Sequence, residues 1–295
     1  MSSRPFFSIV IPTYNRASLV VDTIHSVLKQ ELPDFEIIVV DDGSKDDTDA
    51  RVKAIKDNRL FYHKKENGER GAARNYGARI ARGEYINFFD SDDLMYPNHL
   101  STARKLIDEK RSPEFFHLGY DFKDPDGTLT RKVDQLDDSV RQKAMFDNFL
   151  SCNGVFVRKD IVQQFPFEEA RVLASAEDWE LWIRLLSRYT LQYSNTITST
   201  VINHDQRSIR TIPTEKIIAR DTYMIDALAK DAAVLSAFGK KWNKFVAERY
   251  TFFMLCLSED KRWGDMRKWA IMAAKTYPMI TTSSRFLASI RKSIL

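Results

Sequence analysis

Short runs of apolar residues alternate with amphipathic segments over residues 1–120. Each run is continuous rather than alternating, which is typical of strands buried on both faces of a parallel sheet. The segments between the runs place apolar side chains at helical spacing. The pattern predicts an α/β fold with a doubly wound, mostly parallel sheet and helices on both faces. The predicted strands are 7–11, 35–40, 60–62 and 85–89, and the predicted helices are 19–28, 46–55 and 72–82.

The pattern is mixed between residues 113 and 212 and helical from residue 213 onward. Apolar positions that recur about every 3.6 residues distinguish the helices from the strands. The predicted strands are 115–122, 154–157 and 191–202, and the predicted helices are 176–186, 225–235 and 245–257. We therefore expect two domains, an α/β domain over residues 1–212 and a C-terminal helical region over residues 213–295.

The composition is that of an ordinary soluble globular chain, since 43% of the 295 residues are hydrophobic and 29% are charged. No apolar stretch approaches the roughly 18 residues of a membrane-spanning helix. The apolar run near the N-terminus is too short to be expected as a signal peptide. The two cysteines, Cys152 and Cys256, cannot form a disulfide framework or a metal cluster. These features predict a reducing, cytoplasmic location.

The net charge of +4 is unevenly distributed along the chain. Residues 240–295 contain 12 Lys and Arg but only four Asp and Glu, whereas the rest of the chain has a net charge of −4. This asymmetry indicates an anionic partner for the basic end, or alternatively a solvated helical face. Nucleic acid is not expected as the partner, because the acidic residues of the main domain would repel a phosphate backbone.

Carboxylates gather where the predicted strands end. The strand ends carry Pro12-Thr13-Tyr14, Asp41-Asp42 and Asp90-Ser91-Asp92-Asp93. Ligands of open α/β sheets bind outside the carboxyl ends of the strands, so these residues are expected to meet. Several carboxylates on one rim repel each other, and a divalent cation with oxygen ligands relieves that repulsion. The alternative is that these acids only cap helices and form turns.

Five motifs carry a resemblance to a known family. They are SIVIPTYNR, IIVVDDGSKDDT, ENGERGAARNYGAR, GEYINFFDSDD and SAEDWELWIR, in this order. Together they resemble the family-2 glycosyltransferases of the GT-A fold, over residues 6–205. The resemblance does not extend to the C-terminal helices. For these helices, contacts with an acceptor, with a membrane or with a second subunit remain open.

The resemblance implies a nucleotide-sugar site. Its residues are Pro12, Thr13, Tyr14, Asp42, Arg74, Asp90 and Ser91. Tyr14 is expected to stack on the base beside Thr13, and Asp42 to accept the imide N–H of uracil. Asp41 either lies near the ribose or closes its turn. Arg74 either approaches the donor phosphates or pairs with the acids of the rim.

The resemblance also implies a metal and a general base. Asp92 is expected to bind Mg²⁺ or Mn²⁺ directly, and the metal to neutralise the departing diphosphate. Asp90 is expected to reach the ribose or, through water, the metal, and His204 to meet the metal or the diphosphate. Asp178 is expected to take the proton of the acceptor hydroxyl, with Glu177 supporting it. The alternative for these two acids is a role in the first turn of a helix, where its dipole stabilises them.

The function that follows is an inverting transfer of a sugar from a nucleotide donor, most simply a UDP-sugar, to a glycan or lipid-linked acceptor. Enzymes of this kind build surface polysaccharides, so the inner face of the membrane is a second expected location. Two alternatives stay open, a nucleotidyltransferase and a non-catalytic binder of nucleotide sugars. The glycine fingerprints of dinucleotide-binding folds and of P-loop enzymes are absent from the sequence.

Overall fold

The computed structural model describes residues 4–133, 135–204 and 212–292. The chain divides into two compact units, Met1–Arg207 and Ser208–Leu295. The border between them falls outside the described residues, so the expected boundary at residue 212 stays a prediction.

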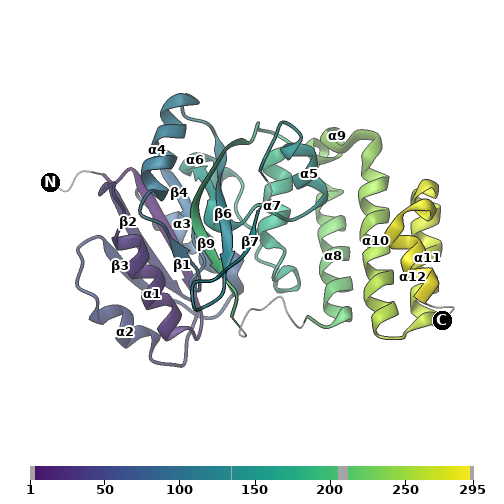
Figure 1. Ribbon diagram of the computed structural model, residues 1–295, viewed down its shortest axis with the longest axis horizontal. Helices are drawn as coiled ribbons and strands as arrows, with labels where there is room; N and C mark the ends of the chain where they lie inside the picture. The colour runs from purple at the N-terminus through teal and green to yellow at the C-terminus, as the bar shows by residue number, and fades with distance from the viewer. Residues whose placement is uncertain (1–3, 134, 205–211, 293–295) are drawn as a thin grey trace. The chain divides into compact units, whose positions relative to one another are not determined.

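One mixed sheet runs through the first unit (Figure 1). Its strands are β1 (Phe7–Thr13), β2 (Phe35–Asp41), β3 (Leu60–Lys64), β4 (Tyr85–Phe88), β5 (Leu94–Met95), β6 (Phe115–Lys123), β7 (Leu129–Lys132), β8 (Val155–Arg158) and β9 (Gln192–Ile202). Among the described residues the strand order is β3-β2-β1-β4-β8-β6-β9-β5, and β7 pairs with β6. The expected α/β architecture is confirmed.

The helices of this unit cover both faces of the sheet. They are α1 (Ala17–Leu28), α2 (Thr48–Ala54), α3 (Glu69–Ile80), α4 (His99–Glu109), α5 (Val140–Phe146), α6 (Lys159–Gln164) and α7 (Glu177–Leu186). Ile9 and Ile11 of β1 share a core cluster with residues of α1, α2 and α4. Val10 points the other way, and its Cγ1 would lie 2.3 Å from a Cβ added at Gly77 of α3. Neighbouring residues of a strand face opposite sides, so α1 and α3 lie on opposite faces.

The first four strands in space are parallel, as predicted, and the rest of the sheet is not uniformly so. β1 pairs in parallel with β2 and β4, and β2 with β3. β8 runs antiparallel between β4 and β6, whereas β6 and β9 are parallel. Asn87 fixes the start of β8, because its side-chain amide donates to the carbonyls of Asn153 and Val155, both at 2.9 Å. The sheet is therefore more mixed than the apolar runs alone predict.

The second unit contains helices only, among its described residues. They are α8 (Thr214–Leu228), α9 (Ala232–Phe238), α10 (Trp242–Glu259), α11 (Trp263–Thr276) and α12 (Ser284–Lys292). The single helix predicted over residues 225–235 is wrong. The chain breaks before α9 because the Asp231 carboxylate accepts the backbone N–H groups of Ala233 and Val234, which is an N-cap. In the described chain, no helix combines the length and the apolar character needed to cross a membrane.

Candidate active site

The ends of β1 and β2 lie side by side, as expected. Thr13 stands opposite Asp41 in the parallel register, and the Asp42 N–H donates to the Thr13 carbonyl at 2.9 Å. Pro12 and Thr13 are buried, whereas the Tyr14 side chain is 43% exposed. The Thr13 hydroxyl is buried without a hydrogen-bond partner among the described residues. An exposed aromatic ring beside this strand end is free to stack on a planar ligand.

Asp42 is held by three donors that sequence reasoning missed. Its Oδ1 accepts from Lys65 Nζ at 2.8 Å and from the Gly68 N–H at 2.9 Å. Its Oδ2 accepts from Asn67 Nδ2 at 3.0 Å. All three donors lie in or beside the ENGER motif, so that motif could have pointed to them. They hold a nearly buried carboxylate in one orientation with lone pairs left for another donor.

Asp41 closes its own turn, which is one of the two roles considered for it. Its Oδ1 accepts the Ser44 N–H at 2.7 Å, and its Oδ2 accepts the Tyr62 hydroxyl at 2.5 Å. Burial and the Asp41 charge raise the pKa of Tyr62, so the phenol keeps its proton and donates. Asp41 therefore positions the turn from which Asp42 projects.

Arg74 joins two motifs that are far apart in the sequence. Its Nη1 donates to Glu177 Oε1 at 2.7 Å and its Nη2 to Asp90 Oδ1 at 2.9 Å. The guanidinium is 2% exposed and lies over the Phe167 ring, 5.3 Å from its centroid. Burial opposes the charge on Asp90, but the nearby arginines, Arg74 foremost, hold the pKa of Asp90 below its usual range. Pairing with the rim acids is thus the arrangement that Arg74 adopts.

Asp92 and His204 are in contact, although 112 residues separate them. Asp92 Oδ2 lies 2.9 Å from His204 Nε2 and 2.8 Å from Arg16 Nη1. Arg16 was not among the expected site residues, although it ends the SIVIPTYNR motif. Carboxylate and imidazole groups suit Mn²⁺, and carboxylates suit Mg²⁺.

The described residues do not include a ready-made set of three metal-binding side chains of His, Cys, Asp or Glu. Mg²⁺ commonly binds through one or two carboxylates together with substrate phosphates. The side chains of Asp92 and His204 therefore fit a metal ion whose remaining ligands come in part from a bound diphosphate. Ser91, between the two acids of the motif, is buried.

Asn153 supports the acidic rim and was not predicted. Its Nδ2 donates to Asp93 Oδ2 at 2.6 Å, and its Oδ1 accepts the Asp90 N–H at 2.9 Å. Asp93 Oδ1 also accepts the Ile202 N–H at 2.9 Å. Burial, followed by the charges of Asp92 and Asp90, raises the pKa of Asp93 well above its usual range. Asp93 is thus a structural part of the rim that ties β9 to it.

Asp178 lies in the first turn of α7 against other polar groups. Its Oδ1 accepts from the Trp179 N–H at 2.7 Å and from Asn148 Nδ2 at 3.2 Å, and the Cys152 thiol lies 3.9 Å from Oδ2. Burial and the charge of Glu177 raise the pKa of Asp178 to about 6, although Arg74 opposes the shift. A carboxylate with a pKa near neutrality can accept a proton in a reaction and release it afterwards.

The tryptophans of α7 belong to the core. Trp179 Nε1 donates to the Ala144 carbonyl at 2.9 Å, and Trp182 Nε1 to the Leu150 carbonyl at 3.1 Å. Both rings are nearly fully buried. His99 and His117 are buried too, and burial lowers the pKa of each to about 3, which keeps them neutral.

Comparisons with known proteins agree with this geometry. The family described as glycosyl transferase family 2 matches residues 8–148. A Bacillus subtilis protein named for teichuronic acid biosynthesis, the glycosyltransferase TuaG, is 30% identical over 189 residues, which cover 63% of this chain and 73% of TuaG. The chain belongs to glycosyltransferase family 2.

Other family members and solved structures extend the comparison. An uncharacterised glycosyltransferase of Rickettsia bellii is 34% identical over 187 residues, which are 62% of this chain and 27% of that protein. The chain spans between 27% and 47% of the length of five relatives, the Rickettsia bellii protein included. Residues 1–349 of Staphylococcus aureus TarS, in complex with UDP-GlcNAc, superpose with a TM-score of 0.70 at 20% identity, covering 98% of this chain and 88% of TarS.

A second solved structure has the same fold. The mannosyltransferase PcManGT of Pyrobaculum calidifontis, in complex with GDP-Man and Mn²⁺, gives a TM-score of 0.62 at 16% identity, covering 99% of this chain and 88% of that one. At these identities the two structures establish the GT-A-like fold of this family member and no more.

Proposed function

We propose that this family-2 protein transfers a sugar from a UDP-sugar to an acceptor hydroxyl, with inversion and with the help of Mg²⁺ or Mn²⁺. One observation carries the proposal. The Arg74 guanidinium contacts both Asp90, in the donor motif, and Glu177, which adjoins the candidate base. The buried Arg74 side chain thus holds the donor-binding rim next to the acceptor side. A transfer between two substrates requires the two sites to be adjacent.

The donor side is assigned from its hydrogen-bonding groups. The fixed carboxylate of Asp42 suits the imide N–H of uracil, and the exposed ring of Tyr14 suits a stacked base. TarS was solved with UDP-GlcNAc and PcManGT with GDP-Man, so both families of donor occur on this fold. Asp42 can accept the single imide N–H that uracil presents, and UDP is the donor nucleotide that we propose.

Asp92, Asp90 and His204 are the residues that we expect to hold the cation. Bound there, Mg²⁺ or Mn²⁺ supplies positive charge to the leaving diphosphate. Arg16 contacts Asp92 and lies on the same rim, so it contributes further positive charge.

Asp178 is the proposed base. The acceptor oxygen attacks the anomeric carbon while its proton passes to an Asp178 oxygen. A new carbon–oxygen bond forms on one face of the sugar, and the bond to the diphosphate breaks on the other. A single in-line displacement of this kind inverts the anomeric centre and needs no covalent enzyme intermediate. A nucleotidyltransferase that acts on a sugar phosphate would need no such base, because the attacking phosphate oxygen is already ionised.

The test compares two variants in one assay. Asp178→Asn should lower turnover about 10²–10⁴-fold, the usual value of general-base catalysis, and leave UDP binding unchanged. Asp92→Asn should instead weaken the metal-dependent part of UDP binding, measured by calorimetry with and without a chelator. Asp108→Asn, on the exposed face of α4, is the control and should change neither. Near-normal turnover of Asp178→Asn, or UDP binding indifferent to metal, would contradict the assignment.

We further propose that the protein acts in surface glycan synthesis on a glycan or lipid-linked acceptor at the inner membrane face. The name of TuaG, a relative in teichuronic acid biosynthesis, supports this setting. From Met266 to Leu295 the chain has six Lys and Arg and no acidic residue. The large apolar side chains exposed in this segment are Ile271, Met272, Met279 and Leu287. Cationic and apolar side chains mixed in this way suit an anionic lipid surface.

A further inference from the structure

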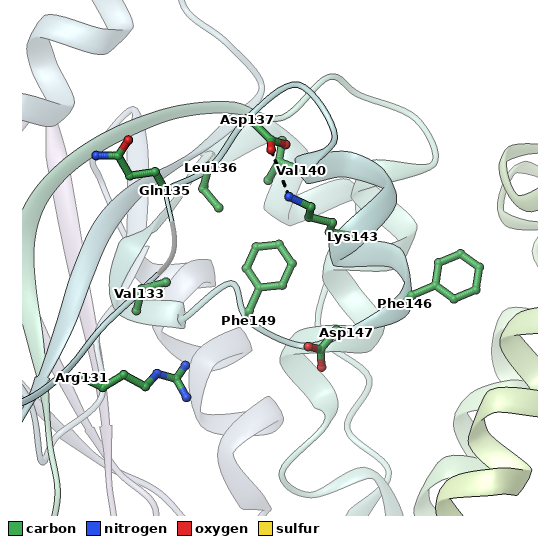
Figure 2. Close-up of a pocket in the computed structure, with 10 residues that line it drawn as sticks. All are labelled: Arg131, Val133, Gln135, Leu136, Asp137, Val140, Lys143, Phe146, Asp147 and Phe149. Carbon is green, nitrogen blue, oxygen red and sulfur yellow. Dashed lines mark hydrogen bonds and ion pairs between the residues drawn. The ribbon is translucent and has the colours of Figure 1, made fainter. Parts of the chain in front are cut away.

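A pocket lies between β7, the following loop and α5, away from the donor motifs. Its volume is about 720 Å³, and it is lined by Arg131, Val133, Gln135, Leu136, Asp137, Val140, Lys143, Phe146, Asp147 and Phe149. Figure 2 shows the Phe149 ring in the middle of the labelled side chains, whereas Phe146 is turned away from them. A volume of this size is typical of sites that enclose small organic ligands.

The walls of the pocket are fastened to the rest of the unit by hydrogen bonds. Asn195 of β9 holds Leu136 twice, accepting its N–H at 2.8 Å and donating to its carbonyl at 3.0 Å. The Tyr120 hydroxyl donates to the Phe149 carbonyl at 2.8 Å. Arg141 of α5 donates to the Leu186 carbonyl at the end of α7, at 2.9 Å. The pocket is thus lined by one stretch of chain, residues 131–149, which hydrogen bonds to distant parts of the sequence hold in place.

The pocket adjoins the proposed base. Asn148 stands between two lining residues, Asp147 and Phe149, and its amide donates to Asp178 at 3.2 Å. The Trp179 indole, one residue beyond Asp178, donates to a carbonyl of α5. The Asn148 side chain therefore links the wall of the pocket to the carboxylate that would deprotonate an acceptor.

The lining favours a neutral ligand with one apolar face and many hydroxyl groups. Its charged residues are two cations and two anions, and one of each, Lys143 and Asp137, form an ion pair at 3.1 Å. The Phe149 ring, with Val133 and Val140, offers an apolar surface. The carboxylate of Asp147 is exposed and can accept hydrogen bonds from hydroxyl groups. A phosphate or another strong anion would find no excess of positive charge here.

We propose that this pocket binds a neutral sugar residue of the acceptor, adjacent to the sugar whose hydroxyl is glycosylated. The inference rests on the proposed function and names the substrate class of its acceptor side as a neutral oligosaccharide. The Phe149 ring packs on the apolar face of that sugar, and Asp147 accepts from its hydroxyl groups. Asn148 is a positioning residue, since it orients Asp178 from the segment that the sugar contacts.

The test uses the full chain saturated with UDP and three neutral probes, maltotriose, triacetylchitotriose and mannotriose, whose binding is followed by saturation-transfer NMR. At least one trisaccharide should bind saturably. Phe149→Ala and Asp147→Asn should each weaken that binding about tenfold, as truncating a central contact does. Phe165→Ala removes a half-buried ring that does not line the pocket, so its binding should match the wild type. Phe149→Leu keeps an apolar side chain in the wall of the pocket but removes the flat ring, so it should still weaken binding. Weaker binding by this folded variant shows that the ring itself is needed.

The outcomes are separable from those of the proposed function. If no trisaccharide binds while UDP still does, the pocket assignment is wrong and the transferase assignment stands. If a trisaccharide binds Phe149→Ala and Phe149→Leu as tightly as it binds the wild type, it occupies another place and the assignment is also wrong. If UDP itself fails to bind the wild type, the proposed function fails independently of the pocket.

Discussion

Asp178 lies close to another acid, Glu177, and this sets the pH at which it can act. Because burial and Glu177 raise its pKa to about 6, transfer should rise with pH along a limb centred near that value. Glu177→Gln removes the neighbouring negative charge, so the limb should move to lower pH. Rates measured across the pH range test this. A wild-type limb near 3.8, the ordinary value of an aspartate, would contradict it.

The same shift affects stability with a definite sign. The folded chain holds the Asp178 proton to a higher pH than the unfolded chain does. Its contribution to stability is therefore greatest below about pH 3.8 and declines as the pH rises to about 6. The protein thus loses some stability when the base reaches its reactive form, and Asp178→Asn should remove this part of the pH dependence.

The loss of Arg74 should cost far more stability than the loss of an exposed ion pair. Arg74→Ala leaves Glu177 buried without its partner, and breaking a buried ion pair costs about 3–5 kcal/mol. Urea unfolding measures the difference in free energy. Lys105→Ala, which breaks an exposed pair with Glu109 on α4, is the matched control and should cost only about 0.3–0.5 kcal/mol. Equal losses in the two variants would contradict the structural role given to Arg74.

At this scale the sequence predicts some residues and not others. Pro12, Asp42, Asp92 and Asp178 stand in motifs whose order along the chain already points to a site. Asn148, Asn153 and Lys65 act through contacts with motif residues, and their side chains carry no pattern of their own. Only the folded chain brings such residues to the acids that they orient.

At the scale of helices and strands, the close packing of α3 on β1 depends on one residue, Gly77. A Cβ at Gly77 would lie 2.3 Å from Val10 Cγ1, so Gly77→Ala forces the helix away from the sheet. Overpacking of this kind costs about 1–3 kcal/mol. Gly264→Ala in α11 meets no atom within 4 Å and should be neutral or slightly stabilising. Thermal unfolding of the two variants tests the pair, and a neutral Gly77→Ala would contradict it.

Elements with a repeated apolar pattern are predicted well, because burial itself produces the pattern. β1 and β2, with every residue buried, coincide closely with their apolar runs. The direction of β8 could not be read from its sequence, since a short buried strand looks the same in either direction. The break between α8 and α9 was missed because apolar spacing continues across it, although Asp231 is a strong N-cap.

The two units carry opposite net charges in the molecule as a whole. Residues 1–207 have a net charge of −4, and residues 208–295 have +8. We expect binding to vesicles of phosphatidylcholine and phosphatidylglycerol that weakens as salt is raised, because screening shortens the reach of the charges. Leu287→Glu should reduce this binding, whereas Leu129→Glu, which changes another exposed leucine on β7, should not. Co-sedimentation measures it. Absence of binding at low salt would favour helix packing or a second subunit instead.

The contacts that complete the acidic rim also determine the stage of folding at which the rim forms. Asp92 meets His204 across 112 residues, Asp93 meets Ile202 across 109, and Arg74 meets Glu177 across 103. We expect such long loops to close late in folding, because the chain loses the conformational entropy of the loop before the new contact stabilises it. On the nucleotide side, Asp42 meets its donors Lys65 and Gly68 across only 23 and 26 residues, so this side closes shorter loops. We therefore expect the contacts around Asp42 to form before β9 reaches Asp93 and completes the rim.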